Sequence, residues 1–171
     1  MPAGAQEIDG DLAMTEAQEI DRDSAMTEAL KYRNTLEIGF GGTGLAISAN
    51  YQRKLAIRPQ YYMNAAIGVG TVPLSGGIVI PHQISLNLGK WRSYLELGIA
   101  GIYWTGYSDA SGYSERIYSY QLSPVIGYRR HFFNRLVLRV YVNPLFHISG
   151  EYYLENWSII PYAGLSIGHA F

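Results

Sequence analysis

The sequence predicts an all-β protein: a closed antiparallel up-and-down transmembrane β-barrel of eight strands, with a flexible or partly helical N-terminal tail. Three observations lead to this fold class. Apolar residues alternate with small or polar ones over most of the chain, the 171 residues include 15 Tyr and 19 Gly, and only 16% of them are charged. The sequence contains no run of about 18 apolar residues, the length that a membrane helix needs.

Residues 163–171 show the alternation most clearly. Ala163, Leu165, Ile167, His169 and Phe171 alternate with Gly, Ser, Gly and Ala. A strand puts these two sets on opposite faces. An apolar face towards lipid and a small or polar face towards a narrow interior are typical of a transmembrane strand. A soluble strand can alternate too, so the prediction depends on repetition elsewhere.

Seven earlier stretches repeat this pattern, and turn signals separate them. The predicted strands are 36–40, 45–52, 61–69, 78–88, 95–103, 118–128 and 136–148. The predicted turns are 41–44, 53–59, 72–77, 90–92, 105–116, 130–135 and 150–156. In the second strand we expect Leu45, Ile47, Ala49 and Tyr51 to face outward. Eight strands make the smallest closed bacterial barrel, which leaves no free edge.

The faces would be reversed in a soluble lipocalin-like barrel, whose apolar side points inward. The minority face here consists of Gly, Ser, Asn and Gln, which cannot fill a soluble core by hydrophobic burial. Aromatic residues also gather near the predicted strand ends, where amphipathic rings meet lipid headgroups. We therefore expect the apolar face to point towards lipid. Reference residues are, outward, Leu97, Ile126, Val140 and Ile167 and, inward, Glu96 and Arg139.

Residues 1–33 form an acidic tail, and residues 34–171 form the predicted barrel domain. The tail has eight acidic residues against three basic ones, a net charge of −5. Residues 5–16 recur almost unchanged as residues 17–28, but two copies of a twelve-residue unit are too few for a solenoid. A solvated linker, a short helix near residues 24–32 and a periplasmic docking peptide all fit this pattern.

Turn lengths predict the orientation in the membrane, because periplasmic turns are short and extracellular loops are long. The loops at 105–116 and 150–156 then lie outside, and both termini are periplasmic. The periplasmic turns carry a basic rim made of Arg53, Lys54, Arg58, Lys90, Arg92, Arg129, Arg130 and Arg135. The acidic tail, or another envelope protein, could dock on this rim through weak, salt-screened pairs.

Four charged residues fall on the inward face, where burial is costly unless they form pairs. An eight-stranded barrel is just wide enough for its own side chains. We expect Glu37, Glu96, Arg129 and Arg139 to form a lumen polar network with Asn64, Gln83, Asn87, Gln121 and Asn143. Such a network favours a structural role over a proton or ion pathway and argues against a general diffusion pore.

Signals for catalysis and ligand binding are weak. His147 and Ser149, with Glu151 and Glu155 nearby, resemble the His-x-Ser pair and Glu of outer-membrane lipid A deacylases. Strands show this spacing by chance, and the pair falls inside the predicted barrel, so we assign no catalytic residue. The four His are dispersed and Cys is absent, so we expect no metal site, and no cofactor motif is present.

Four segments resemble small outer-membrane β-barrel proteins of the Bacteroidota type, namely 41–53, 94–101, 126–130 and 161–171. The resemblance covers about residues 35–171. It implies the outer membrane of a Gram-negative bacterium, contact with outer-membrane lipid and lipopolysaccharide, and a terminal Phe171 that acts as the signal read by the barrel-insertion machinery. It implies no settled activity.

Together these features favour a non-enzymatic outer-membrane barrel that acts as a structural or interaction subunit of the cell envelope, within a larger membrane complex. The alternatives are an outer-membrane lipid-modifying enzyme that hydrolyses acyl esters, and a narrow channel. We expect neither a cofactor nor a nucleic-acid partner.

Overall fold

The computed structural model describes residues 31–58, 60–72, 77–108, 115–132, 135–150 and 159–171. Most of the predicted helix near residues 24–32, half of the loop at 105–116, and Glu151 and Glu155 lie outside the described residues. Within the described ranges, no helix is long and apolar enough to cross a membrane.

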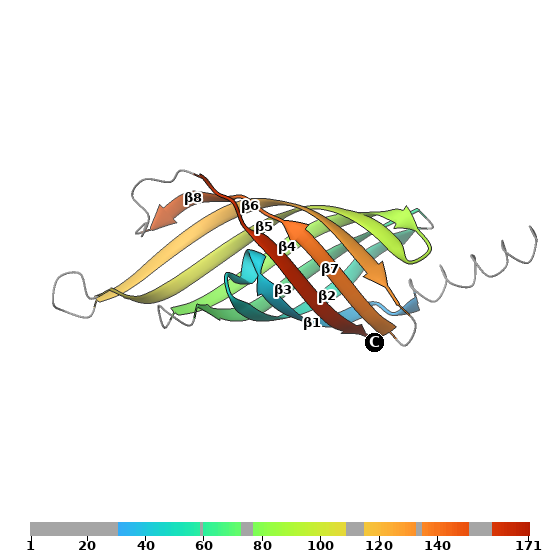
Figure 1. Cartoon of the computed structure of the whole chain (residues 1–171), viewed down its shortest axis with the longest axis horizontal. Helices are drawn as coiled ribbons and strands as arrows, with labels where there is room; N and C mark the ends of the chain where they lie inside the picture. The colour runs from blue at the N-terminus through green and yellow to red at the C-terminus, as the bar shows by residue number, and fades with distance from the viewer. Residues whose placement is uncertain (1–30, 59, 73–76, 109–114, 133–134, 151–158) are drawn as a thin grey trace, which may run out of the picture.

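The described strands form one antiparallel sheet that closes into a barrel (Figure 1). The strands are β1 (Asn34–Gly41), β2 (Ile47–Arg58), β3 (Tyr61–Val72), β4 (Gly77–Lys90), β5 (Ser93–Ser108), β6 (Glu115–His131), β7 (Leu136–Val142), β8 (Leu145–Gly150), β9 (Ile159–Ile160) and β10 (Ala163–Ala170). Pairing of β1 with β10, β10 with β7, β7 with β6 and β6 with β5 completes the ring. Because β7 and β8 are parts of one strand, as are β9 and β10, the barrel has the eight strands that the sequence predicts.

The first and last strands pair along their length, with Ile38 opposite Ile167. Residues 34 and 171 therefore meet at one end of the barrel. The backbone N–H groups of Asn34 and Phe171 each donate to the other residue's carbonyl oxygen, at 3.1 and 2.9 Å. We call this the terminal end. The opposite end, towards which the chain runs between β3 and β4, β5 and β6, and β8 and β9, is the loop end (Figure 1).

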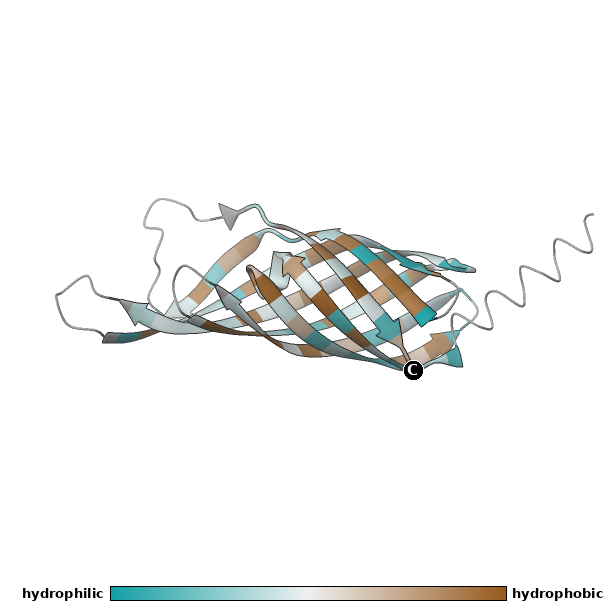
Figure 2. Ribbon diagram, turned by 60° about the horizontal axis from the view of Figure 1, so that its bottom comes forward, coloured by the Kyte–Doolittle hydropathy of each residue, from teal (hydrophilic) through white to brown (hydrophobic). Residues whose placement is uncertain are grey.

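Large apolar side chains cover the outside of the barrel, and charged side chains lie inside it. Between 39% and 55% of the side-chain surface is exposed for Leu97, Ile126, Val140 and Ile167. Glu96 and Arg139, by contrast, are only 0% and 4% exposed. Figure 2 shows the alternation of hydrophobic and hydrophilic positions along the strands. The prediction of a transmembrane barrel is confirmed, because a soluble barrel would have the opposite arrangement.

The second strand is longer than predicted. β2 continues to Arg58 and pairs with β3 as far as Tyr61, which takes most of the expected turn over 53–59 into the barrel wall. A bulge between Lys54 and Ala56 shifts the register of this pair. Lys54 is buried because β2 continues and keeps it on the inward face with Ser48 and Gln52, although its polarity indicated a turn. Polarity misplaced this boundary because the inside of the barrel also accepts charged side chains.

The predicted turns beside β6 are also too long. β5 continues to Ser108 and β6 begins at Glu115, so both ends of the expected loop over 105–116 belong to the wall. At its other end β6 runs to His131, which shortens the turn expected over 130–135. Strand pairing therefore extends into segments whose Gly, Ser and Arg content resembles a loop.

Three prolines interrupt one side of the wall. The strand predicted over 136–148 is divided at Asn143 and Pro144, and the last strand is divided at Pro161. When the registers of these strand pairs are continued, Pro124, Pro144 and Pro161 lie side by side on neighbouring strands. Proline has no N–H to donate to a ladder. This proline row separates the long ladders towards the terminal end from the short β8–β9 pair towards the loop end.

The turn between β1 and β2 folds into the barrel. It contains the short helix η1 (Gly42–Gly44), whose residues are all buried. Gly41 and Gly42 have φ angles of +68° and +57°, and a Cβ on Gly42 would lie 2.4 Å from the Tyr141 ring. Leu45 was expected to face outward, but it is partly buried against apolar residues inside the barrel. That prediction is wrong because the alternation of inward and outward side chains stops at the end of β1.

We predict that the cost of a charge on the outer face depends on its position along β5. Ile99 and Tyr107 face outward with 65% and 61% exposure, but Ile99 lies in the middle of the strand and Tyr107 near its loop end. Ile99→Arg should lower the free energy of unfolding by about 2–4 kcal/mol and Tyr107→Arg by about 0–1 kcal/mol. Denaturant titration in lipid vesicles measures both; equal losses would contradict a membrane-embedded outer face.

Candidate functional site: the filled lumen

Charged side chains from four strands meet in the middle of the lumen. Arg129 of β6 donates to Glu37 of β1 at 2.9 Å, and its other terminal nitrogen lies 3.5 Å from Glu96 of β5. Arg139 of β7 donates to Glu96 at 2.5 Å. All four side chains are at most 4% exposed. Acidic and basic side chains alternate in the order Glu37, Arg129, Glu96 and Arg139. Because the group has two carboxylates and two guanidinium groups, it has no net charge.

Neutral polar side chains complete the shells of the two carboxylates. Ser166 of β10 donates to Glu37 at 2.9 Å. Gln83 of β4 donates to Glu96 at 2.6 Å and accepts a 2.8 Å hydrogen bond from Arg139. Charge-assisted hydrogen bonds such as these are stronger than neutral ones. They tie β4 and β10 to the charged strands.

The network continues through amides towards β2. Ser85 Oγ lies 2.8 Å from Glu96 and 2.5 Å from Asn64 Oδ1. Asn87 also donates to Asn64, at 2.9 Å, and Asn64 donates to Gln52 of β2 at 2.8 Å. We call all these residues, together with the four charged ones, the lumen network. It contacts all eight strands of the barrel.

An aromatic and basic layer fills the lumen between the lumen network and the terminal end. Tyr62, Tyr94 and His131 pack edge to face, with ring centroids 5.0–6.1 Å apart. Tyr62 Oη lies 3.1 Å from His131 Nε2. The ammonium group of Lys54 lies 4.9 Å from the centre of the Tyr62 ring, a cation–π contact.

An apolar layer fills the lumen on the loop side. The buried residues of this layer are Val79, Ile102, Trp104, Ile117 and Leu145, and Leu45 and Tyr162 pack against them. Tyr141 lies between this layer and the charges, with Arg139 3.8 Å from its ring centre and Thr43 Oγ1 3.4 Å from its hydroxyl. Three stacked layers, aromatic, charged and apolar, therefore occupy the described length of the lumen.

Two residues that were expected in the lumen network lack its hydrogen bonds. Asn143 is fully buried, and neither side-chain atom has a hydrogen-bond partner among the described residues. Gln121 Oε1 is also buried without one in the same part of the chain. Buried polar atoms of this kind are commonly satisfied by ordered water.

His147 and Ser149 lie on β8 near the loop end. His147 Nδ1 lies 3.5 Å from Ser119 Oγ of β6, whereas Ser149 is exposed and pairs with Tyr120. The carboxylates proposed to orient the pair, Glu151 and Glu155, lie outside the described residues. Across the described ranges, no group of three or more His, Asp or Glu is placed to hold a metal ion.

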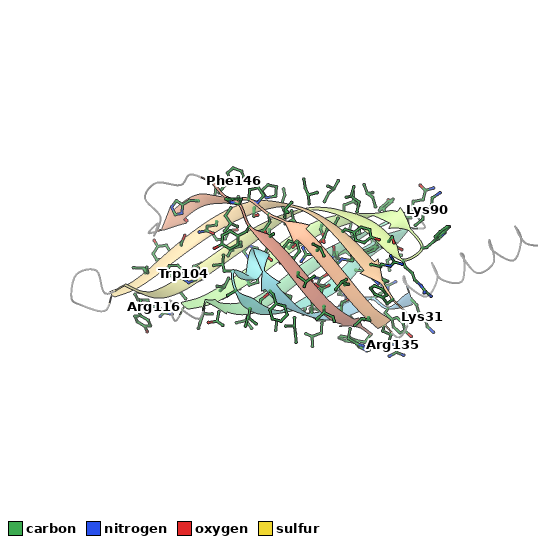
Figure 3. The ribbon with its side chains drawn as sticks, viewed as in Figure 1. Lys31, Lys90, Trp104, Arg116, Arg135 and Phe146 are labelled. Carbon is green, nitrogen blue, oxygen red and sulfur yellow. The ribbon has the colours of Figure 1, made fainter. Side chains whose placement is uncertain are left out.

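Basic residues gather at the terminal end. Figure 3 shows Lys31, Lys90 and Arg135 there. Arg58 and Arg130 are also exposed near this end. One of the expected rim residues belongs to the lumen instead: Lys54 is 5% exposed. It was misplaced because it lies close to a strand end, where inward and rim positions look alike in sequence. Arg129 was assigned both to the rim and to the lumen network, and at 2% exposure it lies in the network.

The acidic side chains of the described residues lie elsewhere. Glu37 and Glu96 are inside the lumen, and Glu115 begins β6 at the loop end. The terminal end is therefore basic over the part of the chain that the structure describes. Phe171 is exposed at this end, and its role as an insertion signal stays a prediction.

No family model and no curated protein sequence matches the chain. Among solved structures, the chain is similar to the N-terminal β-barrel domain of Pseudomonas aeruginosa OprF. The TM-score is 0.58 at 10% sequence identity, and the alignment covers 82% of this chain and 98% of that one. At this identity the likeness supports the fold, an eight-stranded barrel of the outer-membrane type, and leaves the lumen residues to be interpreted from their own contacts.

Several lumen residues were not singled out from the sequence, notably Gln52, Tyr62, Ser85 and Ser166. The alternation assigned most of them to the inward face but could not identify their partners. Glu37 and Ser166, for example, are 129 positions apart. Closure of the barrel brings them together, and only the register between β1 and β10 would have indicated the contact.

We predict that removing one member of the charged group destabilises the barrel more than removing an acidic residue together with its basic partner. Glu96→Gln should lower the free energy of unfolding by about 3–5 kcal/mol, because Arg139 and Arg129 lose a buried partner. Adding Arg139→Met should restore part of the loss, since the unpaired cation is removed. A double-mutant cycle in denaturant measures the coupling; additive losses would show that the pair is not coupled.

Proposed function

We propose that the protein resides in the outer membrane of a Gram-negative bacterium with both termini in the periplasm. There it acts as a non-enzymatic structural or interaction subunit of the cell envelope. The filled lumen is the observation that carries this proposal. Paired charges flanked by an aromatic layer and an apolar layer leave little room for solute passage, so contacts with other molecules are made on the outer face and at the two ends.

The basic terminal end supports an interaction role. Arg58, Lys90 and Arg135 offer cations at this end, and residues 1–33 carry a net charge of −5. An acidic envelope protein, or the tail itself, matches this charge. Such exposed pairs are individually weak and salt-sensitive, so several must act together. That the chain is a small barrel of the Bacteroidota type, and that it belongs to a larger membrane complex, are parts of the same proposal.

The filled lumen predicts a barrel that does not conduct. The purified protein in a planar bilayer should give no large, steady current steps, because the lumen network blocks the pathway. A 16-stranded porin, whose interior is an aqueous channel, serves as the positive control in the same bilayer. Large, steady conductance from the purified protein would favour the narrow-channel alternative or a wider pore.

The basic terminal end predicts charge-dependent partners. Affinity purification from native membranes, followed by mass spectrometry, should recover envelope proteins with the wild type. The triple variant Arg58→Gln, Lys90→Gln and Arg135→Gln should lose them. Arg116→Gln at the loop end is the matched control, because it removes an exposed cation from the opposite end. Recovery of the same proteins with the triple variant would contradict docking at this end.

Deleting residues 1–33 separates the two acidic candidates. If an envelope protein docks on the basic end, the truncated chain should keep its partners. If the tail provides the contact that recruits them, the truncated chain should lose them while the Arg116→Gln control keeps them. Partners that are unaffected by both the deletion and the triple variant would exclude this end as the interaction surface.

A further inference from the structure

A shallow groove of about 880 Å³ lies on the outer face of the barrel over strands β3 to β6. This volume is within the range of about 300–1,000 Å³ that is usual for small-molecule sites. Most of the lining is apolar and points outward, including Met63, Ile67, Ile84, Leu97, Ile99 and Leu122. In a transmembrane barrel this face contacts lipid, so the groove is open to acyl chains.

One end of the groove carries a polar pair. His82 of β4 and Tyr120 of β6 stack with ring centroids 5.8 Å apart and an interplanar angle of 19°. His82 Nε2 lies 3.0 Å from the Tyr120 hydroxyl oxygen. Both side chains line the groove at its loop side, on a face that is otherwise apolar.

Gly101 of β5 makes this arrangement possible. It pairs directly with His82 and lies between the strands that carry the two rings. A Cβ on Gly101 would lie 2.1 Å from His82 Nε2 and 2.4 Å from the Tyr120 hydroxyl. Any side chain at this position would therefore displace both rings. Because Gly101 has no side chain, His82 and Tyr120 can form their hydrogen bond directly over its backbone.

The pair has hydrogen-bonding capacity to spare. Neutral His has one donor and one acceptor, and the Tyr hydroxyl can both donate and accept. Their mutual hydrogen bond uses one donor, so one N–H or O–H remains without a partner among the described residues. A polar group without a partner is costly in hydrocarbon. A ligand acceptor at this point would remove that cost.

The depth of the pair in the membrane indicates which acceptor it meets. Exposed Tyr103, Tyr107 and Tyr118 lie on the same face towards the loop end, and Tyr120 pairs with Tyr103. Tyrosines on the outside of such barrels mark the boundary between headgroups and hydrocarbon. The acyl-ester carbonyls of membrane lipids lie at that boundary. They accept hydrogen bonds and cannot donate them.

We propose that the groove binds a membrane lipid, with an acyl chain along its apolar walls and the ester carbonyl of that chain accepting a hydrogen bond from the His82–Tyr120 pair. The inference needs only the transmembrane barrel and is independent of the role proposed above. The site binds and orients the lipid; the half-buried pair serves as the hydrogen-bond donor.

The test compares two lipids that differ in the carbonyl alone. The full chain is released from detergent micelles containing equal amounts of dioleoyl phosphatidylcholine and its diether analogue, and native mass spectrometry counts the lipid retained. The wild type should retain the diester about two- to tenfold more than the diether, as expected for one net hydrogen bond. Tyr120→Phe and His82→Leu should bring this ratio close to one.

Tyr118→Phe is the matched control, because Tyr118 is exposed on the same strand and face and should leave the ratio unchanged. Gly101→Leu should reduce retention of both lipids by blocking the groove. Heat-modifiable gel migration verifies that each variant is folded, and Tyr120→Phe carries the test if Gly101→Leu does not fold. Equal retention of diester and diether by the wild type would overturn the proposal. So would a homodimer or a co-purifying protein that Gly101→Leu releases.

Discussion

The charged chain of Glu37, Arg129, Glu96 and Arg139 is the interaction on which the structure depends. A barrel in lipid cannot expose these groups on its outer face, and a narrow interior offers them little water. They therefore satisfy one another. Two of the contacts join strands that are not consecutive: Glu37 of β1 with Arg129 of β6, and Glu96 of β5 with Arg139 of β7. Side-chain contacts across the lumen thus reinforce the closure that backbone pairing provides at the wall.

The layers on either side of the charges explain how the lumen is filled without a large hydrophobic core. Towards the terminal end, Tyr62 and His131 combine ring packing with a hydrogen bond. Towards the loop end, the turn at Gly42 folds inward and places Leu45 on the apolar layer. The outside is then largely apolar, and His82 and Tyr120 meet on it above Gly101.

The alternation of residues was sufficient to predict the fold, because closure in lipid requires that polar and apolar side chains separate by face. It also indicated that Glu37 and Arg139 lie inside. It could not predict that Lys54 joins them, because the charges of residues 53–58 resemble a turn whereas β2 continues through them. Nor could it predict that Leu45 points inward, because the alternation stops in the turn between β1 and β2. Which lumen residues bind one another, for example Ser166 and Glu37, depends on the registers between strands. Local sequence does not encode these registers.

The row formed by Pro124, Pro144 and Pro161 has a consequence for motion. Long ladders join β6, β7 and β10 towards the terminal end, whereas β8 and β9 beyond the row share a pairing of only two residues on each strand. Segments with few cross-strand hydrogen bonds open at low free energy, independently of the rest. We therefore expect the amide protons of β9, and those of β8 on its side towards β9, to exchange with solvent faster than the amide protons of the strands that carry Glu37, Arg129, Glu96 and Arg139.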